Sequence, residues 1–282
     1  MYRYETHLHT SEGSACGSSS GAEYPALFKE RGYDGIFITD HFYHGNSAPD
    51  RDLPWPEYVE QYMRGYEAAK KVGDEIGFKV FFGIEEAFEG DEYLIYGLDK
   101  EFLTAHPEMR DWTREYMIDL VHGAGGVVMQ AHPFRDVFYI PKIHLLMDGV
   151  DGIEGINTSN TANDNLAALC YARRYGLKVT AGSDTHNVSS VNDGNGGIIT
   201  ERPVDSVQDL VNIIKNGEPL RIFYPEELFA GAGEINVKLP SEIRRNGSWE
   251  DLAPEELAEW FCASPETGAE LVKSILKELG AV

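Results

Sequence analysis

Cysteine is scarce in this sequence, and its scarcity argues against a disulfide-built domain. The 282 residues include three cysteines, Cys16, Cys170 and Cys262. Their odd number and wide spacing favour a reducing compartment, and we expect the cytoplasm. A chain of this length can bury a sizeable core without cross-links.

Long hydrophobic runs are missing as well. No uninterrupted apolar stretch approaches the roughly 20 residues that a membrane-spanning helix needs. The N-terminal segment MYRYETHLHT also lacks the basic and apolar regions of a signal peptide. We therefore expect no membrane partner.

Basic residues are outnumbered, with 24 Lys and Arg against 47 Asp and Glu and a formal net charge of −23. A groove for nucleic acid normally carries a basic patch that neutralises phosphates. Basic residues cluster here only as pairs such as Lys70–Lys71 and Arg244–Arg245. Polymeric nucleic acid is thus not expected as a partner. A small phosphorylated substrate is compatible with this acidic composition, because bound metal ions can supply positive charge locally.

Short apolar runs alternate with longer helical patterns through most of the chain. The expected strands are 2–8, 35–39, 79–84, 126–130, 152–156, 178–181 and 220–223, with 93–97 as a further strand or hairpin arm. The expected helices are 22–31, 56–76, 110–122, 162–175 and 204–216. This alternation indicates an α/β fold with a mainly parallel sheet, and about seven βα units favour closure into a barrel.

The pattern changes after residue 225. Two segments, from Ser248 and from Ser264, begin with a serine followed by early acidic residues, which is typical of a helix N-terminus. We expect residues 1–225 to form the barrel. Residues 226–282 are expected to form a small loop and helical extension that packs against it.

Two histidines, His7 and His9, stand two residues apart in the first expected strand. Side chains two apart in a strand point the same way. Two imidazoles side by side suit one metal ion or two neighbouring ions. A pair of surface histidines is the alternative, because this spacing often arises by chance.

Four other expected strands also end in residue types that bind metals. In a parallel barrel these ends meet at one rim, where side chains from distant parts of the sequence converge. Five such strand ends favour a metal centre over coincidence. The residues at the other four ends are Asp40 with His41, Glu85, His132, and Asp184 with His186.

The motifs HLHT, ITDH, GIE, AHP and GSDTH, in this order, resemble the polymerase and histidinol phosphatase (PHP) family of metal-dependent phosphoesterases. The resemblance covers residues 1–225. It implies a distorted (β/α)7 barrel with two or three divalent ions of zinc, manganese or iron at the C-terminal rim. It also implies that a metal-bound hydroxide hydrolyses a small phosphate monoester, of nucleotide type or histidinol-phosphate type.

The resemblance also implies a set of metal ligands, in which Glu85 would bridge two ions. The family places a further His or Asp in the loop after the first motif. Here that loop offers Glu12 as an oxygen ligand, with the Cys16 thiolate as the alternative. The implied ligands are His7, His9, Glu12, His41, Glu85, His132, Asp184 and His186.

The sequence departs from the family after the GIE motif. Several members with three metals have a histidine on the next strand, where DEYLIYGL here offers Tyr93 and Leu94. Asp91 and Glu92 are nearby but are expected to be out of register. The departure leaves the number of ions open between two and three.

Other residues are candidates for substrate contact or for support of the site. Arg135 follows His132 by three residues, and its guanidinium matches phosphate geometry, although a surface ion pair is the alternative. Asp184 or a metal-bound water could assist the leaving alkoxide. Trp55 and Tyr58 could touch a substrate ring, although packing is the default interpretation for Trp55.

Three further polar residues have two interpretations each. Glu154 and Asn157 end another expected strand, so they could hydrogen-bond to ligands or substrate, or simply be polar residues at a strand end. Asp40 could support the metal ligands or cap a turn.

Two other function classes remain open. A metal hydroxide on a barrel rim also hydrolyses C–N or lactone bonds in amidohydrolases, which share the paired histidines. Such enzymes use a lysine between two metals, and Lys79 and Lys178 begin strands at the wrong rim. The other alternative is a non-catalytic metal-binding regulatory barrel.

Overall fold

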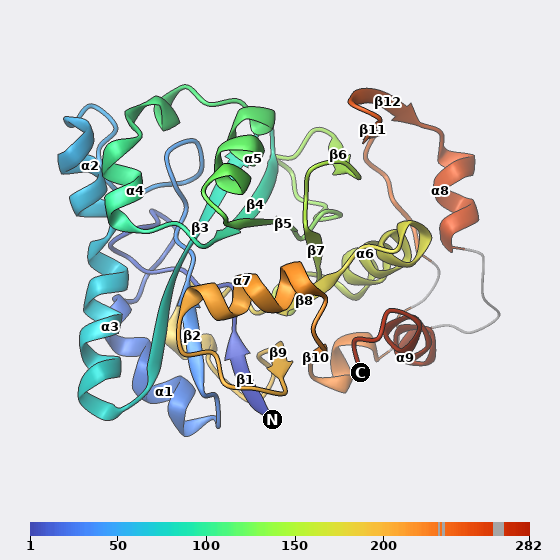
Figure 1. Ribbon diagram of the computed structural model, residues 1–282. Coiled ribbons are helices and arrows are strands. Elements are labelled where there is room, and N and C mark those ends of the chain that lie inside the picture. The colour runs from blue at the N-terminus through green and yellow to red at the C-terminus, as the bar shows by residue number, and fades with distance from the viewer. Residues whose placement is uncertain (231, 233–234, 262–267) are drawn as a thin grey trace.

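The computed structural model describes residues 1–230, 232, 235–261 and 268–282. Its main sheet has nine strands in the order β10-β9-β1-β2-β3-β4-β5-β7-β8. The edge strands β8 and β10 lie beside each other, so the sheet is a nearly closed barrel (Figure 1). The expected α/β barrel is thereby confirmed. The strands are β1 (Tyr2–Glu5), β2 (Gly35–Ile38), β3 (Lys79–Phe88), β4 (Asp91–Tyr96), β5 (Val127–Ala131), β7 (Gly152–Asn157), β8 (Val179–Gly182), β9 (Gly197–Thr200) and β10 (Leu220–Phe223).

All seven expected strands belong to this sheet, and β4 and β9 complete it. The sheet is mixed, because β4 runs antiparallel to β3 and β5 and β9 runs antiparallel to β1 and β10. A two-residue turn joins β3 to β4, with Glu89 and Gly90 at φ 54° and 100°. Positive φ at both central residues suits the twist of a tight hairpin. This turn therefore reverses the chain where a parallel barrel would have a helix.

Helices flank the sheet and follow the expected positions with local shifts. The expected helix 56–76 is broken at Met63 into α2 (Trp55–Tyr62) and α3 (Arg64–Ile76). The expected helix 110–122 begins later, as α5 (Arg114–Gly123), because the Thr113 side chain caps it through the Tyr116 amide. The remaining helices around the sheet are α1 (Tyr24–Glu30), α4 (Lys100–Ala105), α6 (Ala162–Tyr175) and α7 (Val207–Asn216), with 3-10 turns at Gly21–Glu23, Pro107–Arg110, Val188–Ser190 and Glu226–Phe229.

The chain beyond β10 contributes two helices and two strands of a second sheet, whose third strand, β6, comes from the segment between β5 and β7. Strand β11 (Ser241–Arg245) pairs in parallel with β6 (Ile143–Leu146) and antiparallel with β12 (Ser248–Leu252). The expectation of a helix starting at Ser248 is wrong, because Asn246 and Gly247 at positive φ turn the chain into a hairpin. Ser264 lies outside the described residues. Helices α8 (Pro254–Phe261) and α9 (Gly268–Glu278) pack on α6.

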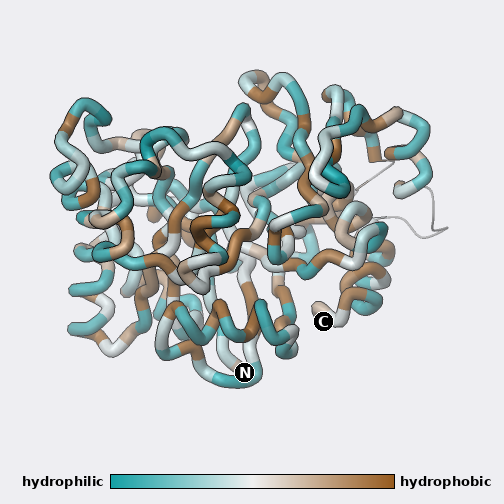
Figure 2. The backbone as a smooth tube through the Cα atoms, turned by 45° about the horizontal axis from the view of Figure 1, so that its top comes forward, coloured by the Kyte–Doolittle hydropathy of each residue, from teal (hydrophilic) through white to brown (hydrophobic). Residues whose placement is uncertain are grey.

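Hydrophobic and hydrophilic residues alternate along the outer helices, as the brown and teal stretches of Figure 2 show. In α3 the buried positions are Gly65, Ala69 and Gly73, four residues apart, which is the spacing of one helix face. These small residues let the helix lie close to the sheet and to the loops at the rim. Among the described residues, no helix combines the length and apolar character needed to cross a membrane.

Candidate metal centre

The two histidines of the first motif lie just beyond β1, which ends at Glu5. Leu8 between them forms an isolated parallel bridge with Thr185, so the extended geometry continues past the strand. The two imidazoles therefore point to the same side, and their Nε2 atoms lie 3.1 Å apart. Both side chains are fully buried. The predicted juxtaposition of His7 and His9 is thus present in the structure.

Each of these imidazoles has an acceptor at its other nitrogen. His7 Nδ1 lies 3.0 Å from Glu154 Oε1, and His9 Nδ1 lies 3.0 Å from Ser14 Oγ. The Ser14 hydroxyl donates to Asp40 Oδ1 at 2.7 Å, so Ser14 is left to accept from His9. A proton on each Nδ1 leaves both Nε2 lone pairs directed at the same point. This is the arrangement by which neighbouring groups orient metal-binding histidines.

Two buried carboxylates face the same point. The oxygens of Glu85 in β3 lie 3.2 Å from the Nε2 atoms of His7 and His9. Asp184 Oδ1, beyond β8, lies 3.0 Å from His9 Nε2. Burial opposes a charged imidazole, yet the carboxylates, led by Glu85, raise the pKa of His7 well above its ordinary value. The buried negative charges of Glu85 and Asp184 thus favour the binding of cations at this point.

The second and third motifs extend the cluster on the other side of Glu85. His132 Nε2 lies 3.1 Å from Glu85 Oε1, and His41 Nδ1 lies 3.0 Å from Glu85 Oε2. Although the buried atoms His41 Nδ1 and Glu85 Oε2 lie this close, their geometry is not that of a hydrogen bond, and neither has another hydrogen-bond partner among the described residues. Buried polar atoms without partners are costly unless another group satisfies them.

Glu92 also belongs to the cluster, contrary to the expectation that it would be out of register. Its carboxylate lies 3.5 Å from His132 Nε2 and 3.6 Å from His41 Nδ1. The hairpin explains this position, because antiparallel β4 begins at the rim where parallel strands end. The alternation of side chains places Glu92 on the same face as Leu94 in the core. The signal for it in the sequence was the Glu89–Gly90 turn.

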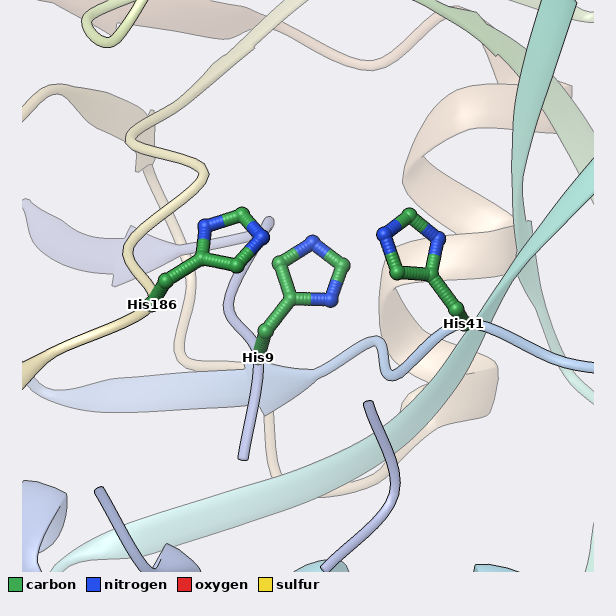
Figure 3. A group of neighbouring side chains, drawn as sticks. All are labelled: His9, His41 and His186. Atoms are coloured by element: carbon green, nitrogen blue, oxygen red, sulfur yellow. The ribbon is translucent and has the colours of Figure 1, made fainter. Parts of the chain in front are cut away.

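The donor atoms group into four sets that could each hold a metal ion, with all atoms of a set within 4.8 Å of one another. Figure 3 shows one set, in which His9, His41 and His186 come from three separate chain segments and point toward one another. The rings of His9 and His186 stack with centroids 4.3 Å apart. The sets are His9, His41 and His186; His7, Glu85 and His132; His7, His9 and Asp184; and His41, Glu85 and Glu92.

Glu12 and Cys16, the two alternative ligands in the loop after the first motif, lie in different surroundings. The Glu12 carboxylate accepts hydrogen bonds from the Gly21 amide at 3.1 Å and the Ser11 hydroxyl at 3.2 Å, and Glu12 belongs to none of the four sets. The structure therefore does not bring Glu12 into the cluster. Cys16 instead lines the cavity beside His41 and His186. Burial opposes ionisation of its thiol, but these two imidazoles lower the Cys16 pKa to about 5.

Backbone strain is found at two of the site residues. His132 and Asp184 have φ of 25° and 54°, a region that residues other than glycine rarely adopt. Such conformations persist where the surrounding structure holds them, commonly at functional sites. In this chain they turn the side chains of two separate strand ends toward Glu85 and His9.

A cavity of about 550 Å³ opens beside the cluster. Arg135 lies in its wall, where its guanidinium forms an ion pair with Asp184 and donates from Nε to Asn160 Oδ1 at 2.9 Å. The structure thus brings Arg135 to the site, as the sequence predicted. The cavity is lined by Cys16, His41, Asn46, Glu92, Arg135, Tyr139, Ser159, Asp184 and His186.

The aromatic pair that the sequence offered for substrate contact lies elsewhere. Trp55 and Tyr58 are buried in a hydrophobic cluster with Phe42. Trp55 Nε1 donates to the Leu103 carbonyl at 2.7 Å, and the Tyr58 hydroxyl pairs with Ser47 Oγ at 2.8 Å. Packing is therefore the correct interpretation for both residues.

Comparison with known proteins points to one family. Residues 162–219, from α6 to the turn after α7, match the family described as PHP-associated. No curated protein sequence matches the chain. The match and the fold confirm the resemblance to the PHP family.

Two solved structures share the fold. One is a two-domain protein containing a predicted PHP-like metal-dependent phosphoesterase from Bacteroides vulgatus ATCC 8482, with 14% identity and a TM-score of 0.59 over 80% of this chain. This chain spans 65% of the length of that protein. The other is PsfC from Pseudomonas syringae PB-5123, with 16% identity and a TM-score of 0.51 over 81% of this chain and 94% of PsfC.

Proposed function

From the resemblance to the PHP family in fold and in the PHP-associated segment, we propose that this chain is a metal-dependent phosphoesterase acting on a small phosphate monoester. The observation that carries the proposal is the pair of His7 and His9 Nε2 atoms, 3.1 Å apart. Two neutral imidazoles whose lone pairs face each other at this distance repel, and a shared metal ion or proton removes the repulsion.

The residues fit divalent ions in both chemistry and burial. Imidazole nitrogens and carboxylate oxygens suit zinc, manganese and iron. His41 Nδ1 and Glu85 Oε2, buried without hydrogen-bond partners, would be satisfied by such an ion. Glu85 contacts four histidines of the cluster with its two oxygens, which suits a carboxylate shared between two ions. The proposed ligands are His7, His9, His41, Glu85, Glu92, His132, Asp184 and His186, with Cys16 as a further candidate.

Bound divalent ions would supply Lewis acidity and lower the pKa of water at the site. The chain's own part is to position the groups around the phosphorus. Arg135, fixed by Asn160, would hold the non-bridging phosphate oxygens through its fork of N–H donors. Although burial raises the pKa of Asp184, His7 and Arg135 hold it well below the ordinary value, so this carboxyl starts ionised. It would take the proton released by the attacking water and pass it to the leaving oxygen.

The surroundings of the cluster support this role. Glu154 accepts from Asn157 Nδ2 at 2.9 Å while it holds His7, and Asp40 holds the loop of His9 through Ser14. We therefore assign Glu154, Asn157 and Asp40 as positioning residues. We also retain residues 1–225 as the catalytic barrel and 226–282 as an extension, as a proposal about domain organisation.

The amidohydrolase alternative requires a lysine between two metals, and the described residues that line the cavity beside the cluster include no lysine. Lys79 Nζ pairs with Asp205, and Lys178 Nζ contacts the Ile214 carbonyl. Both partners belong to the segment around α7, and each lysine stands at the start of its strand, opposite the rim.

The test is hydrolysis of an aryl phosphate by the purified chain with added Mn²⁺ or Zn²⁺. His9→Ala and Asp184→Ala should each abolish turnover. Arg202→Ala, which breaks an exposed ion pair with Asp209 outside the cluster, is the matched control and should retain it. Turnover that persists in both His9→Ala and Asp184→Ala would contradict the proposal. Fewer than one tightly bound ion per chain would favour a non-catalytic scaffold instead.

A further inference from the structure

Two neighbouring aromatic side chains, Phe138 and Tyr139, are exposed in the loop between β5 and β6, and Tyr139 lines the cavity beside the cluster. Phe138 is 101% exposed and Tyr139 is 57% exposed, whereas most aromatic rings of the chain are buried. Their rings meet edge to face, with centroids 5.3 Å apart. An exposed ring gains free energy when a ligand removes it from water, because burial of apolar surface is favourable.

The loop that carries them is held at both ends. Phe134 and Ile140, on either side, are 2% and 6% exposed. The Ile140 amide donates to the Val137 carbonyl at 3.0 Å, which closes a turn beneath the two rings. The buried anchors and the turn therefore present the aromatic pair in a defined place and limit the entropy lost on binding.

Tyr139 also connects the aromatic pair to the phosphate-binding side of the cavity. Its side chain lines the cavity together with Arg135. A phosphate held by Arg135 would thus have its ester group close to the Tyr139 ring. The cavity of about 550 Å³ falls within the roughly 300–1,000 Å³ usual for small-molecule sites, so it has room for more than phosphate.

The charge of the cavity wall restricts what the ester group can be. Glu92 and Asp184 line the wall, and the whole chain carries a net charge of −23. A second anionic group on the substrate would meet like charge there, whereas an uncharged ring would not. Aromatic rings prefer edge-to-face or offset contact with other rings, which the pair of Phe138 and Tyr139 offers.

We propose that Phe138 and Tyr139 form a binding subsite for an aromatic or heteroaromatic ring on the leaving group of the phosphate monoester. This inference rests on the proposed phosphoesterase function and narrows its substrate class. Tyr139 would contact the ring inside the cavity, and Phe138 would cover it from the solvent side. The subsite contributes to binding and places no new group at the phosphorus.

The test compares 2-phenylethyl phosphate with butyl phosphate, two alkyl esters with similar leaving groups that differ in the ring. For the wild-type chain with Mn²⁺, KM for the phenyl ester should be about five- to tenfold lower than KM for butyl phosphate. This ratio corresponds to the free energy of one aromatic contact and the apolar area that it buries. Tyr139→Ala and Phe138→Ala should bring the ratio of the two KM values close to one. Tyr139→Phe keeps the ring and should retain most of the preference.

Tyr116→Ala is the matched control, because Tyr116 on α5 is 45% exposed and lies outside the lining of the cavity. It should keep the wild-type ratio. Equal KM values for the two esters in the wild type, or a preference that survives Tyr139→Ala, would overturn the inference and leave the phosphoesterase proposal standing. Hydrolysis of neither ester would overturn both. A chain that sediments as a dimer, and as a monomer after Phe138→Ala with an unchanged KM ratio, would show that a second copy covers the rings instead.

Discussion

Glu92 and His41 come from different strands, and the Glu92 carboxylate lies 3.6 Å from His41 Nδ1. His41 follows a parallel strand, whereas Glu92 begins the antiparallel strand β4. A hairpin therefore supplies an oxygen donor at a rim that is otherwise built from strand ends. Burial and the neighbouring Glu85 raise the pKa of Glu92, and its ionised form needs a nearby cation.

The role of Glu92 can be tested against a neighbour on the same hairpin. We expect Glu92→Gln to weaken the binding of one divalent ion by at least about tenfold, because the amide removes a charged oxygen donor. Titration of the metal-free chain with Mn²⁺ in a calorimeter measures this. Glu89→Gln changes an exposed carboxylate in the turn and should leave affinity as in the wild type. Equal affinities for the wild type and Glu92→Gln would contradict a ligand role.

We expect substrate binding to depend on Arg135 so closely that even a conservative substitution weakens it. Arg135→Lys keeps the positive charge but loses the forked N–H donors and the contact with Asn160. We expect KM for an aryl phosphate to rise about tenfold. Steady-state kinetics check this, with Arg202→Lys as the control from an exposed ion pair. Retention of the wild-type KM in Arg135→Lys would show that the residue serves only as an ion-pair partner.

Cys16 can be tested by a spectroscopic signature that is independent of turnover. If the thiolate joins His41 and His186 as a ligand, the Co²⁺-loaded chain should show a thiolate-to-cobalt charge-transfer band in the near ultraviolet. Cys16→Ser should remove the band. Cys170→Ser should keep it, since burial in the core raises the pKa of that thiol to about 11. A wild-type spectrum without the band would exclude Cys16 as a ligand.

Tyr4 should make stability depend on pH in the alkaline range. Burial raises the pKa of its phenol from 10.0 to about 12, although the Val204 amide, which donates to the hydroxyl at 2.8 Å, lowers it. The folded state then holds the proton more tightly than the unfolded state. The resulting stabilisation is complete below about pH 10 and is lost as the pH rises toward 12.

Urea unfolding at several pH values checks this prediction. Between pH 10 and 12 the free energy of unfolding should fall less steeply in Tyr4→Phe than in the wild type. Tyr4→Phe should also lose about 1 kcal/mol at neutral pH, with its hydrogen bond to Val204. Tyr116→Phe, at an exposed site, should follow the wild-type curve. If the free energy of unfolding changed with pH in parallel for Tyr4→Phe and the wild type, the raised pKa of Tyr4 would be contradicted.

Much of the fold followed from the sequence because its signals are local. The capping box of Thr161 and Asp164 and the left-handed Gly176 delimit α6 at the predicted residues. The alternation of apolar runs and helical patterns likewise located all seven expected strands. Where the sequence failed, a nearby turn decided the outcome, as at Asn246 and Gly247, where a hairpin displaced the start of the expected helix from Ser248 to Pro254.

The sequence by itself determined which side chains could form the centre. Paired histidines and acids at strand ends meet at one rim in any barrel of this order, because parallel strands point the same way. Only the tertiary structure placed Cys16 beside the cluster and Glu12 away from it, and only the tertiary structure brought in Glu92, Phe138 and Tyr139. The positions of these residues depend on the path of a loop, on a strand reversal and on two buried anchor residues. Packing between distant segments sets all three, and the local sequence pattern does not.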